Sequence, residues 1–367
     1  MNSLLRRLGP VAVLAATLAA GLPSSAASAA TVRHVFVIVL ENEDAGTTFA
    51  PDSPAPYLAT TLRSRGAFVP GYYGIGHNSL DNYLALVSGQ APNLVTQADC
   101  PIFTDVEPGL PSADGQVLGQ GCVYPAAVET VADQLEARGL TWKAYMEDMG
   151  NDPARDHGTT CAHPALGTPD LTQQASASDQ YATRHNPFVY FHSIIDRPAC
   201  ATRDVPLTAL GPDLAKTSTT ANLTFITPDL CHDGHDATCA DGGPGGLPAA
   251  DAFLRTWVPR ITDSPAFRRD GVLLITFDEA GSDSTACCGE QPGANTPAPG
   301  AQSGGPGGGR TGAVLLSPFI RPGTTTSYDY NHYSALRWVE DAFALPHLGY
   351  AGAAGLRPFG SDVFTAR

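Results

Sequence analysis

The stretch HVFVIVLEN, residues 34–42, decides the fold class. Its first seven residues form a mostly apolar run, rich in β-branched side chains and without polar alternation. Such a run is typical of a strand that is covered on both faces of a parallel sheet. Three further runs have the same character: Leu223–Thr227, 272–277 and Ala313–Leu316. We therefore expect a buried central sheet with mostly parallel strands.

Helical patterns lie between these runs. Residues 254–261 and 336–343 carry apolar side chains at the spacing of an amphipathic helix, although Pro259 predicts a kink or a shortened helix in the first. Residues 130–138 form a third candidate, which ends before Gly139 as helices often do. Strands that alternate with helices predict an α/β fold, with a mostly parallel central sheet and helices on both faces.

Polar side chains follow two of these strands without a gap. Glu41 and Asn42 end the opening stretch, and Asp278 and Glu279 come directly after residue 277. Ligands of an open parallel sheet bind beyond the carboxyl ends of its strands, so these groups are expected at one edge. Three carboxylates repel one another unless a cation lies between them, and the set therefore indicates a divalent metal site. The alternative is that each pair caps a loop or forms a solvated turn.

The stretch HNSLDNYLALVSG, residues 77–89, holds a candidate nucleophile. A helical stripe begins immediately after Ser79, which places this serine at a helix N-terminus, where free N–H groups and the helix dipole favour an anion. A coordinated cation would activate the hydroxyl, and Asn82 in the first turn would donate to a phosphoryl oxygen. Serine is also a favoured helix cap, and that interpretation needs no catalytic role.

The stretch PDLCHDGHD, residues 228–236, follows another strand and is rich in ionisable groups. It contains two histidines and three aspartates: His232, His235, Asp229, Asp233 and Asp236. Such a cluster suits metal ligation or general acid catalysis, and a solvated acidic loop is the alternative. His332, just before the last helical pattern, is either a site histidine or a helix-start residue.

The first thirty residues predict export. Arg6 and Arg7 precede an apolar run over residues 8–22, and small residues follow at 27–30. This is the pattern of a secretory signal peptide, and the run is too short and too interrupted for a good membrane span. We therefore expect a mature protein without a transmembrane segment that is secreted or lies at the exterior of the cell envelope. A retained membrane anchor is the alternative.

Charge and cysteine content narrow the possible partners. The formal charge of the chain is −15, and removal of Arg6 and Arg7 would make it −17. An acidic chain lacks the basic surface of a nucleic-acid binder, so recognition of phosphate must come from a local site.

Eight cysteines, an even number in an exported chain, predict disulfides whose pairing the sequence leaves open. A zinc site would need C-x-x-C spacings, and none occurs.

Two segments interrupt the alternation of strands and helices. Residues 91–124 are rich in Pro, Gly and Asp and contain two cysteines, which predicts a disulfide-tied loop. Residues 284–309 are of low complexity, rich in Gly, Pro and Ala, and predict an excursion beside the site. No interdomain linker is evident, so we expect residues 31–367 to form one domain.

These features together resemble the phosphoesterase family of secreted bacterial acid phosphatases and phospholipase C enzymes, within the alkaline-phosphatase-like superfamily. The resemblance is carried, in family order, by VIVLEN (37–42), HNSLDNYLALVSG (77–89), WKAYMED (142–148), RHNPFVYF (184–191), PDLCHDGHD (228–236), LITFDE (274–279) and YNHYSALRWVED (330–341). The chain looks most similar to the compact secreted acid phosphatases of that family.

The resemblance implies roles for particular residues. Metal ligation is implied for Glu41, Asn42, Asp278 and Glu279, to which we add Asp233, with Ser79 as the nucleophile. Catalytic roles near the phosphoryl group are implied for His77, His235 and His332. Substrate contacts are implied for Asn82, and we extend them to His185 and Asn186. The sequence departs from the family pattern at Asp81, Asp229 and Gly234, where proline, asparagine and methionine are usual.

The expected function is a secreted, metal-dependent hydrolase of phosphoric monoesters, small-molecule or lipid, that acts through a phosphoserine. A phosphodiesterase of the phospholipase C type is the nearest alternative, and an exported non-catalytic binding protein is the alternative of another class. An acyl esterase would require a G-x-S-x-G motif, which the stretch around Ser79 does not contain. Oxygen ligands favour Mg²⁺, Ca²⁺ or Mn²⁺, while nearby histidines leave iron and zinc open. The oligomeric state is not indicated.

Overall fold

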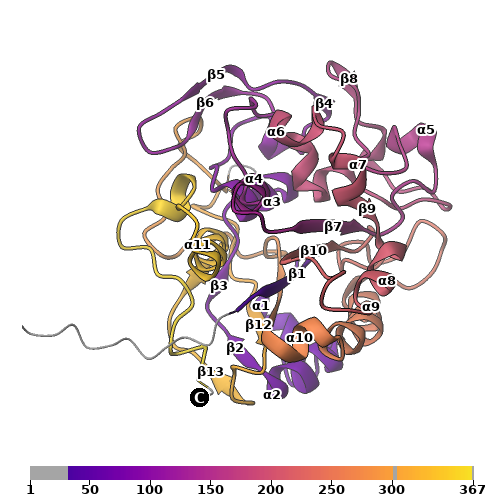
Figure 1. The fold of residues 1–367 in the computed structure, drawn as a ribbon, viewed down its shortest axis with the longest axis vertical. Helices are drawn as coiled ribbons and strands as arrows, with labels where there is room; N and C mark the ends of the chain where they lie inside the picture. The colour runs from indigo at the N-terminus through magenta and orange to yellow at the C-terminus, as the bar shows by residue number, and fades with distance from the viewer. Residues whose placement is uncertain (1–31, 301–303, 366–367) are drawn as a thin grey trace, which may run out of the picture. The chain divides into compact units, whose positions relative to one another are not determined.

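The strand β1, His34–Leu40, lies inside an eight-stranded sheet and is buried along its whole length (Figure 1). The computed structural model describes residues 32–300 and 304–365. The strand order is β13-β2-β12-β11-β1-β10-β7-β9. The bounds in that order are Thr324–Thr325, Ala67–Val69, Ala313–Leu316, Gly271–Phe277, His34–Leu40, Leu223–Thr227, Trp142–Met146 and Asp204–Pro206.

Most neighbouring strands of this sheet are parallel. β1 pairs in parallel with β10 on one side and β11 on the other, and β7 and β9 continue in parallel beyond β10. β12 is the exception, since it runs antiparallel to both β11 and β2. The described part of the connection from β11 to β12, residues 278–300 and 304–312, contains no helix. The chain therefore returns without the helical crossover that usually joins parallel strands.

Helices cover both faces of the sheet. Val35 and Val37 of β1 pack in one hydrophobic core with α3, α4 and α11, while Phe36 and Ile38 pack in a second core with α9 and α10. Figure 1 shows the two groups of helices on opposite sides of the strands. Their bounds are Ser79–Ser88 (α3), Val131–Ala137 (α4), His332–Phe343 (α11), Gly246–Thr262 (α9) and Pro265–Asp270 (α10). The predicted fold class is thus confirmed.

The three predicted helices are present, with one difference. The side chain of Thr130 accepts a hydrogen bond from Asp133 N–H and caps α4, which ends before Gly139 as expected. Pro259 does not shorten α9, which continues to Thr262. The carbonyl that Pro259 leaves without a donor belongs to Arg255, an exposed residue, so water can satisfy it.

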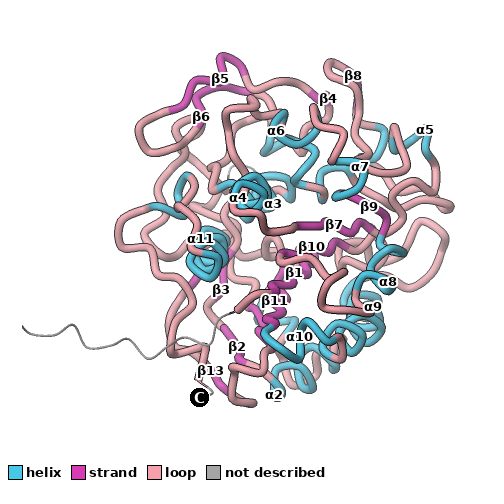
Figure 2. Tube along the Cα trace, in the orientation of Figure 1, coloured by secondary structure: helices cyan, strands magenta, loops and turns pink. Residues whose placement is uncertain are grey.

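The remaining elements are short, and Figure 2 shows how much of the chain outside the sheet is loop. Three small sheets pair β3 (Tyr72–Tyr73) with β14 (Tyr330–Asn331), β4 (Ile102–Phe103) with β8 (Thr168–Pro169), and β5 (Glu107–Pro111) with β6 (Val117–Gln120). The short α-helices are Ala45–Thr48 (α1), Arg63–Arg65 (α2), Pro153–Asp156 (α5), His192–Ile195 (α6), Cys200–Arg203 (α7) and Leu210–Asp213 (α8). The other helical turns are Tyr57–Leu62 (η1), Thr96–Ala98 (η2), Leu171–Gln173 (η3), Thr183–His185 (η4), Pro187–Tyr190 (η5), Leu207–Ala209 (η6) and Gly349–Gly352 (η7).

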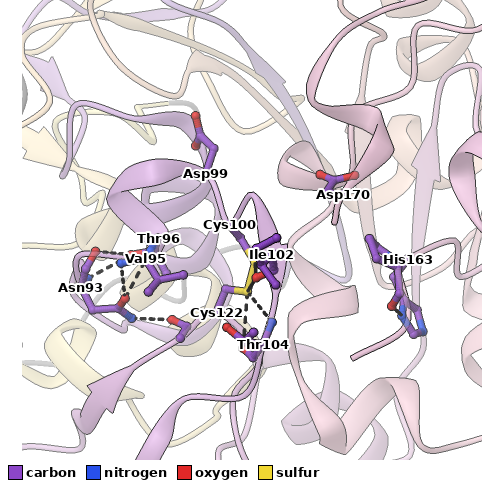
Figure 3. Close-up of a disulfide and its surroundings, with 12 residues drawn as sticks. Asn93, Val95, Thr96, Asp99, Cys100, Ile102, Thr104, Cys122, His163 and Asp170 are labelled. Carbon is purple, nitrogen blue, oxygen red and sulfur yellow. Dashed lines mark hydrogen bonds between the residues drawn. A yellow bond between two sulfur atoms is a disulfide. The ribbon is translucent and has the colours of Figure 1, made fainter. Parts of the chain in front are cut away.

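The expected disulfides are present. Cys100–Cys122 closes the segment 91–124 (Figure 3), and Asp99 precedes Cys100 in the chain. The other pairs are Cys161–Cys200, Cys231–Cys239 and the adjacent Cys287–Cys288. The segment 91–124 is more regular than expected, because it contains β4, β5 and β6.

Two predictions concern the ends of the chain and membranes. The predicted signal peptide, residues 1–30, lies outside the described residues. Within residues 32–300 and 304–365, no helix is both long and apolar enough to cross a bilayer.

Candidate active site

Three loops meet at one edge of the sheet, because the adjacent strands β10, β1 and β11 are parallel. Glu41 N–H donates to the carbonyl of Asp233 (2.9 Å), which joins the loop after β1 to the loop after β10. Asn42 N–H donates to Asp278 Oδ1 (3.0 Å), which joins it to the loop after β11. The sheet therefore brings these four side chains, far apart in the sequence, to one place.

Ser79 is the first residue of α3 and contacts this cluster. Its hydroxyl donates to Glu41 Oε2 (2.8 Å), and the hydroxyl of Tyr83 donates to Glu41 Oε1 (2.6 Å). Glu41 is fully buried, so its carboxylate is held by two hydroxyl donors away from bulk water. Leu80 N–H donates to Asp99 Oδ1 (3.0 Å), which fixes the first turn of the helix. The candidate nucleophile thus lies against a buried carboxylate.

The same cluster has the donor set of a metal site. Ligand atoms of Glu41, His185 and Asp233 lie within 4.8 Å of one another. Five buried atoms have no hydrogen-bond partner in the described part of the chain: Asn42 Oδ1, Asp233 Oδ2, Asp278 Oδ2 and both ring nitrogens of His185. Burial raises the pKa of Glu41 well above its usual range, and the charges of Asp278 and Asp233 raise it further. A divalent cation would satisfy these atoms and offset the repulsion, so the residues fit such an ion.

Glu279 and the two asparagines form a network beside the cluster. Asn42 Nδ2 and Asn82 Nδ2 each donate to a different oxygen of Glu279, both at 2.9 Å. Asn82 Oδ1 accepts the N–H groups of Ile75 and Gly76 (2.7 and 3.1 Å), so its amide is already engaged on both ends. This arrangement suits a positioning role for Asn82 better than the direct substrate contact suggested by the sequence.

His77 lies at the edge of this network. Its Nδ1 is 3.5 Å from Glu279 Oε1, and its Nε2 is 3.1 Å from the carbonyl oxygen of Asp283. The side chain is only partly buried. The structure therefore brings His77 next to the carboxylate cluster, as the sequence suggested, while Asp283 links it to the loop that follows β11.

Two residues suggested as site residues lie deeper in the protein. His332 is fully buried, with Nδ1 3.1 Å from the hydroxyl of Tyr72 and Nε2 bonded to the carbonyl of Asp278. Burial lowers the pKa of His332 to about 4, which favours the neutral imidazole, and its contact with Asp278 ties the helix start to the end of β11. Asn186 is also fully buried, and its Nδ2 donates to Asp204 Oδ2 (2.7 Å). A substrate contact does not fit this placement of Asn186.

The loop over residues 228–236 contributes buried carboxylates and one exposed imidazole to the site. His235 is exposed, its N–H donates to Asp233 Oδ1 (2.9 Å), and its Nδ1 lies 2.7 Å from Asp236 Oδ1. His232 lies between Asp229 and Glu147, whose hydrogen bonds raise its pKa to about 11. His235 is therefore the histidine of this loop that borders Asp233 of the carboxylate cluster.

Asp81, the departure in the first turn of α3, is buried rather than exposed. Neither oxygen of its carboxylate has a hydrogen-bond partner among the described residues. Burial raises the pKa of Asp81 well above its usual range, and the charges of Asp99 and Asp278 add to the rise. The raised pKa favours the uncharged carboxyl, the form that would not repel an incoming phosphate.

Sequence reasoning missed three residues of this region. Tyr83 was read only as part of an apolar stripe, yet it binds Glu41 and stacks on His185, with ring centroids 5.3 Å apart. Asp99 and Arg184 received no role, although Arg184 belongs to the stretch RHNPFVYF. Its position directly before His185 in that stretch is the one sequence feature that points to it.

Comparison with known proteins agrees with this picture. A model of the Phosphoesterase family matches residues 53–346. An acid phosphatase of Aspergillus fumigatus is 24% identical over 330 residues, which are 89% of this chain and 58% of that protein. A phosphatidylinositol-3-phosphatase of Mycobacterium tuberculosis is 25% identical over 355 residues, which are 94% of this chain and 91% of that protein. The chain thus spans little more than half of the fungal enzyme and most of the mycobacterial one.

Solved structures show the same fold at low sequence identity. The crystal structure of Ps i-CgsB has a TM-score of 0.51 and 11% identity, covering 92% of this chain and 77% of that chain. The likeness concerns the fold alone, and it agrees with the α/β architecture described above.

Proposed function

This chain belongs to the phosphoesterase family, and from that premise we propose that it hydrolyses phosphoric monoesters through Ser79. The observation that carries the proposal is the hydrogen bond from Ser79 to the buried carboxylate of Glu41, inside a set of side chains that fits a divalent cation. A serine that only capped a helix would have no need of such surroundings. We further propose that residues 31–367 form one catalytic domain, exported after removal of residues 1–30.

Catalysis begins at the hydroxyl of Ser79. Glu41 accepts its hydrogen bond and orients the oxygen, while Tyr83 holds Glu41 in place. A divalent cation, when bound, lowers the pKa of the attacking hydroxyl and offsets charge on the phosphoryl oxygens. Ser79 Oγ gives its proton to Glu41 and attacks phosphorus, the bond to the substrate alcohol breaks as that alcohol takes up a proton, and a phosphoserine remains. Water then attacks this phosphoserine, which releases phosphate and restores the serine.

His235 is the proposed acid for the leaving alcohol. Its ring is exposed, and Asp236 binds Nδ1, which leaves Nε2 free to face solvent and substrate. His332 is not assigned this step, because both of its nitrogens are engaged in the interior. For His77 we propose a contact with the phosphoryl group, which its position beside Glu279 supports.

The ligands proposed for the ion are Glu41, Asn42, Asp233, Asp278 and Glu279, with His185 added from its position. An imidazole among carboxylates gives a mixed nitrogen and oxygen set. Mixed sets of this kind suit Mn²⁺, iron or zinc better than Ca²⁺, which prefers oxygen ligands alone. With His185 among the ligands, the preferred ions are therefore Mn²⁺, iron or zinc, rather than the Mg²⁺, Ca²⁺ or Mn²⁺ that oxygen ligands alone favour.

The test compares two chromogenic substrates with the purified mature protein. p-Nitrophenyl phosphate and p-nitrophenylphosphorylcholine are assayed side by side from acidic to alkaline pH, with and without a chelator. Chelator-sensitive turnover of the monoester alone supports the proposal. Preference for the diester indicates a phospholipase C type of enzyme, and no turnover of either substrate with any added metal contradicts the catalytic function.

A further inference from the structure

Arg184 is a largely buried cation beside the candidate active site. It lies in the helical turn η4 and is 8% exposed. The next residue, His185, is 3.4 Å from Glu41 and 3.5 Å from Asp233. The side chain of Arg184 thus arises from the same short turn as one of the proposed ligands.

The guanidinium is held from one side. Nη1 donates to the carbonyl of Gln173 (3.3 Å), and Gln173 Nε2 donates to the carbonyl of Asp99 (2.8 Å). Asp99 in turn accepts the N–H of Leu80, the residue after Ser79 (3.0 Å). This series of hydrogen bonds fixes Arg184 relative to the nucleophile. Its Nε and Nη2 have no hydrogen-bond partner among the described residues.

No described carboxylate pairs with this cation. None lies within 4.0 Å of the guanidinium. Burial raises the pKa of Asp99 and of Asp233, and the charge of Arg184 is near enough to oppose part of that rise. The other buried arginine among the described residues, Arg155, is arranged differently, since it forms ion pairs with Asp156 and Asp179, both at 2.9 Å. The unpaired donors of Arg184 are not among the fully buried polar atoms that lack a partner, so an anion from solvent can reach them. Because no described carboxylate pairs with the guanidinium, such an anion would be its closest charge partner.

We propose that Arg184 binds the phosphoryl group of the substrate and makes the site selective for monoesters. This inference rests on the phosphatase function proposed above. A guanidinium donates two parallel hydrogen bonds to phosphate oxygens, and a monoester dianion offers three such oxygens and more charge than a diester monoanion. The chain carries a net charge of −15, so a local cation is needed to bind a dianion.

The competing role of Arg184 is structural. In that case it serves only to offset Asp99 and Asp233 inside the fold and never touches substrate. Its loss would then lower the free energy of unfolding and leave the affinity for phosphate unchanged. Substrate affinity and stability therefore separate the two roles.

The experiment compares wild type, Arg184→Met and Arg184→Lys with Arg337→Met as the control. Arg337 is a partly buried arginine that donates to the carbonyls of Ala351 and Ala353, both at 3.0 Å, so its removal tests the loss of an arginine elsewhere. KM and kcat are measured with p-nitrophenyl phosphate and with bis(p-nitrophenyl) phosphate, and Ki with inorganic phosphate. Thermal unfolding is followed for every variant.

For Arg184→Met we expect KM for the monoester and Ki for phosphate to rise about tenfold or more, the loss typical of hydrogen bonds to a charged group. The KM for the diester changes less, and Arg184→Lys recovers part of the loss. An unchanged Ki in a folded Arg184→Met overturns the proposal while the phosphatase function stands. If wild type turns over neither substrate, the proposed function fails, and calorimetric titration of phosphate into wild type and Arg184→Met decides the role of Arg184 alone.

Discussion

Replacing Asp204 with asparagine should remove a pH-dependent loss of stability. Asp204 is fully buried in β9, where one carboxylate oxygen accepts from Asn186 (2.7 Å) and the other has no partner among the described residues. Burial raises the pKa of Asp204 from 3.8 to about 7, and the hydrogen bond from Asn186 opposes the rise. An asparagine keeps an acceptor for Asn186 and carries no charge at any pH.

The sign follows from comparing the folded and unfolded chains. Well below pH 3.8 the carboxyl of Asp204 is protonated in both states, and its contribution to stability is fully present. Between pH 3.8 and about 7 the unfolded chain loses the proton while the folded chain keeps it, so stability falls as pH rises. Each pH unit in this window costs about 1.4 kcal/mol, which gives at most about 4 kcal/mol above pH 7.

The assay is urea unfolding of wild type and Asp204→Asn near pH 4 and near pH 8, with the exposed Asp52→Asn as control. We expect Asp204→Asn to match wild type at the lower pH and to be more stable, by up to about 4 kcal/mol, at the higher pH. All other titrating groups are common to both proteins and cancel in the difference. The same stability difference at both pH values would refute the reasoning.

Three further predictions concern the site. Tyr83→Phe removes a hydrogen bond to Glu41 and should lower kcat by about tenfold in steady-state assays without unfolding the protein. An unchanged kcat would show that Glu41 needs no such support. Gly234 has a φ of +110°, and a Cβ there would lie 3.2 Å from the carbonyl oxygen of Glu41. Gly234→Ala should therefore lower the free energy of unfolding in denaturant by about 1–3 kcal/mol, and equal stability would contradict this strain. His235→Asn should slow phenyl phosphate, whose leaving group needs a proton, more than p-nitrophenyl phosphate. His332→Gln should slow the hydrolysis of both substrates alike. If His332→Gln instead slowed phenyl phosphate selectively and His235→Asn did not, His332 would be the acid for the leaving group.

The strands were predictable because they are buried on both faces. His34–Leu40, Leu223–Thr227 and Ala313–Leu316 have the bounds that the sequence suggested, and the polar residues that follow two predicted strands mark the site. The direction of β12 was not predictable, since an apolar run of four residues is the same in a parallel or an antiparallel pair. The direction of β12 depends on the path of the connection from β11, which contains no helix in its described part. The low-complexity sequence of that connection does not indicate this path.

Side-chain roles were less predictable than side-chain proximity. His332 and Asn186 belong to stretches that match the family pattern. In the structure, however, His332 binds the carbonyl of Asp278, and Asn186 binds the carboxylate of Asp204, both in the interior. A sequence records which residues are near a strand end but not which hydrogen bonds they satisfy. Arg184 was missed for the same reason, because its lack of a carboxylate partner is visible only in three dimensions.

The most direct test of the account is to trap the covalent intermediate. Wild type and Ser79→Ala are mixed with p-nitrophenyl phosphate, quenched in acid during turnover, digested and analysed by mass spectrometry. We predict one phosphoryl group on the peptide that contains Ser79 in wild type, and neither phosphorylation nor turnover in Ser79→Ala, which should still unfold at the wild-type temperature. Near-normal turnover by a folded Ser79→Ala would contradict the central claim.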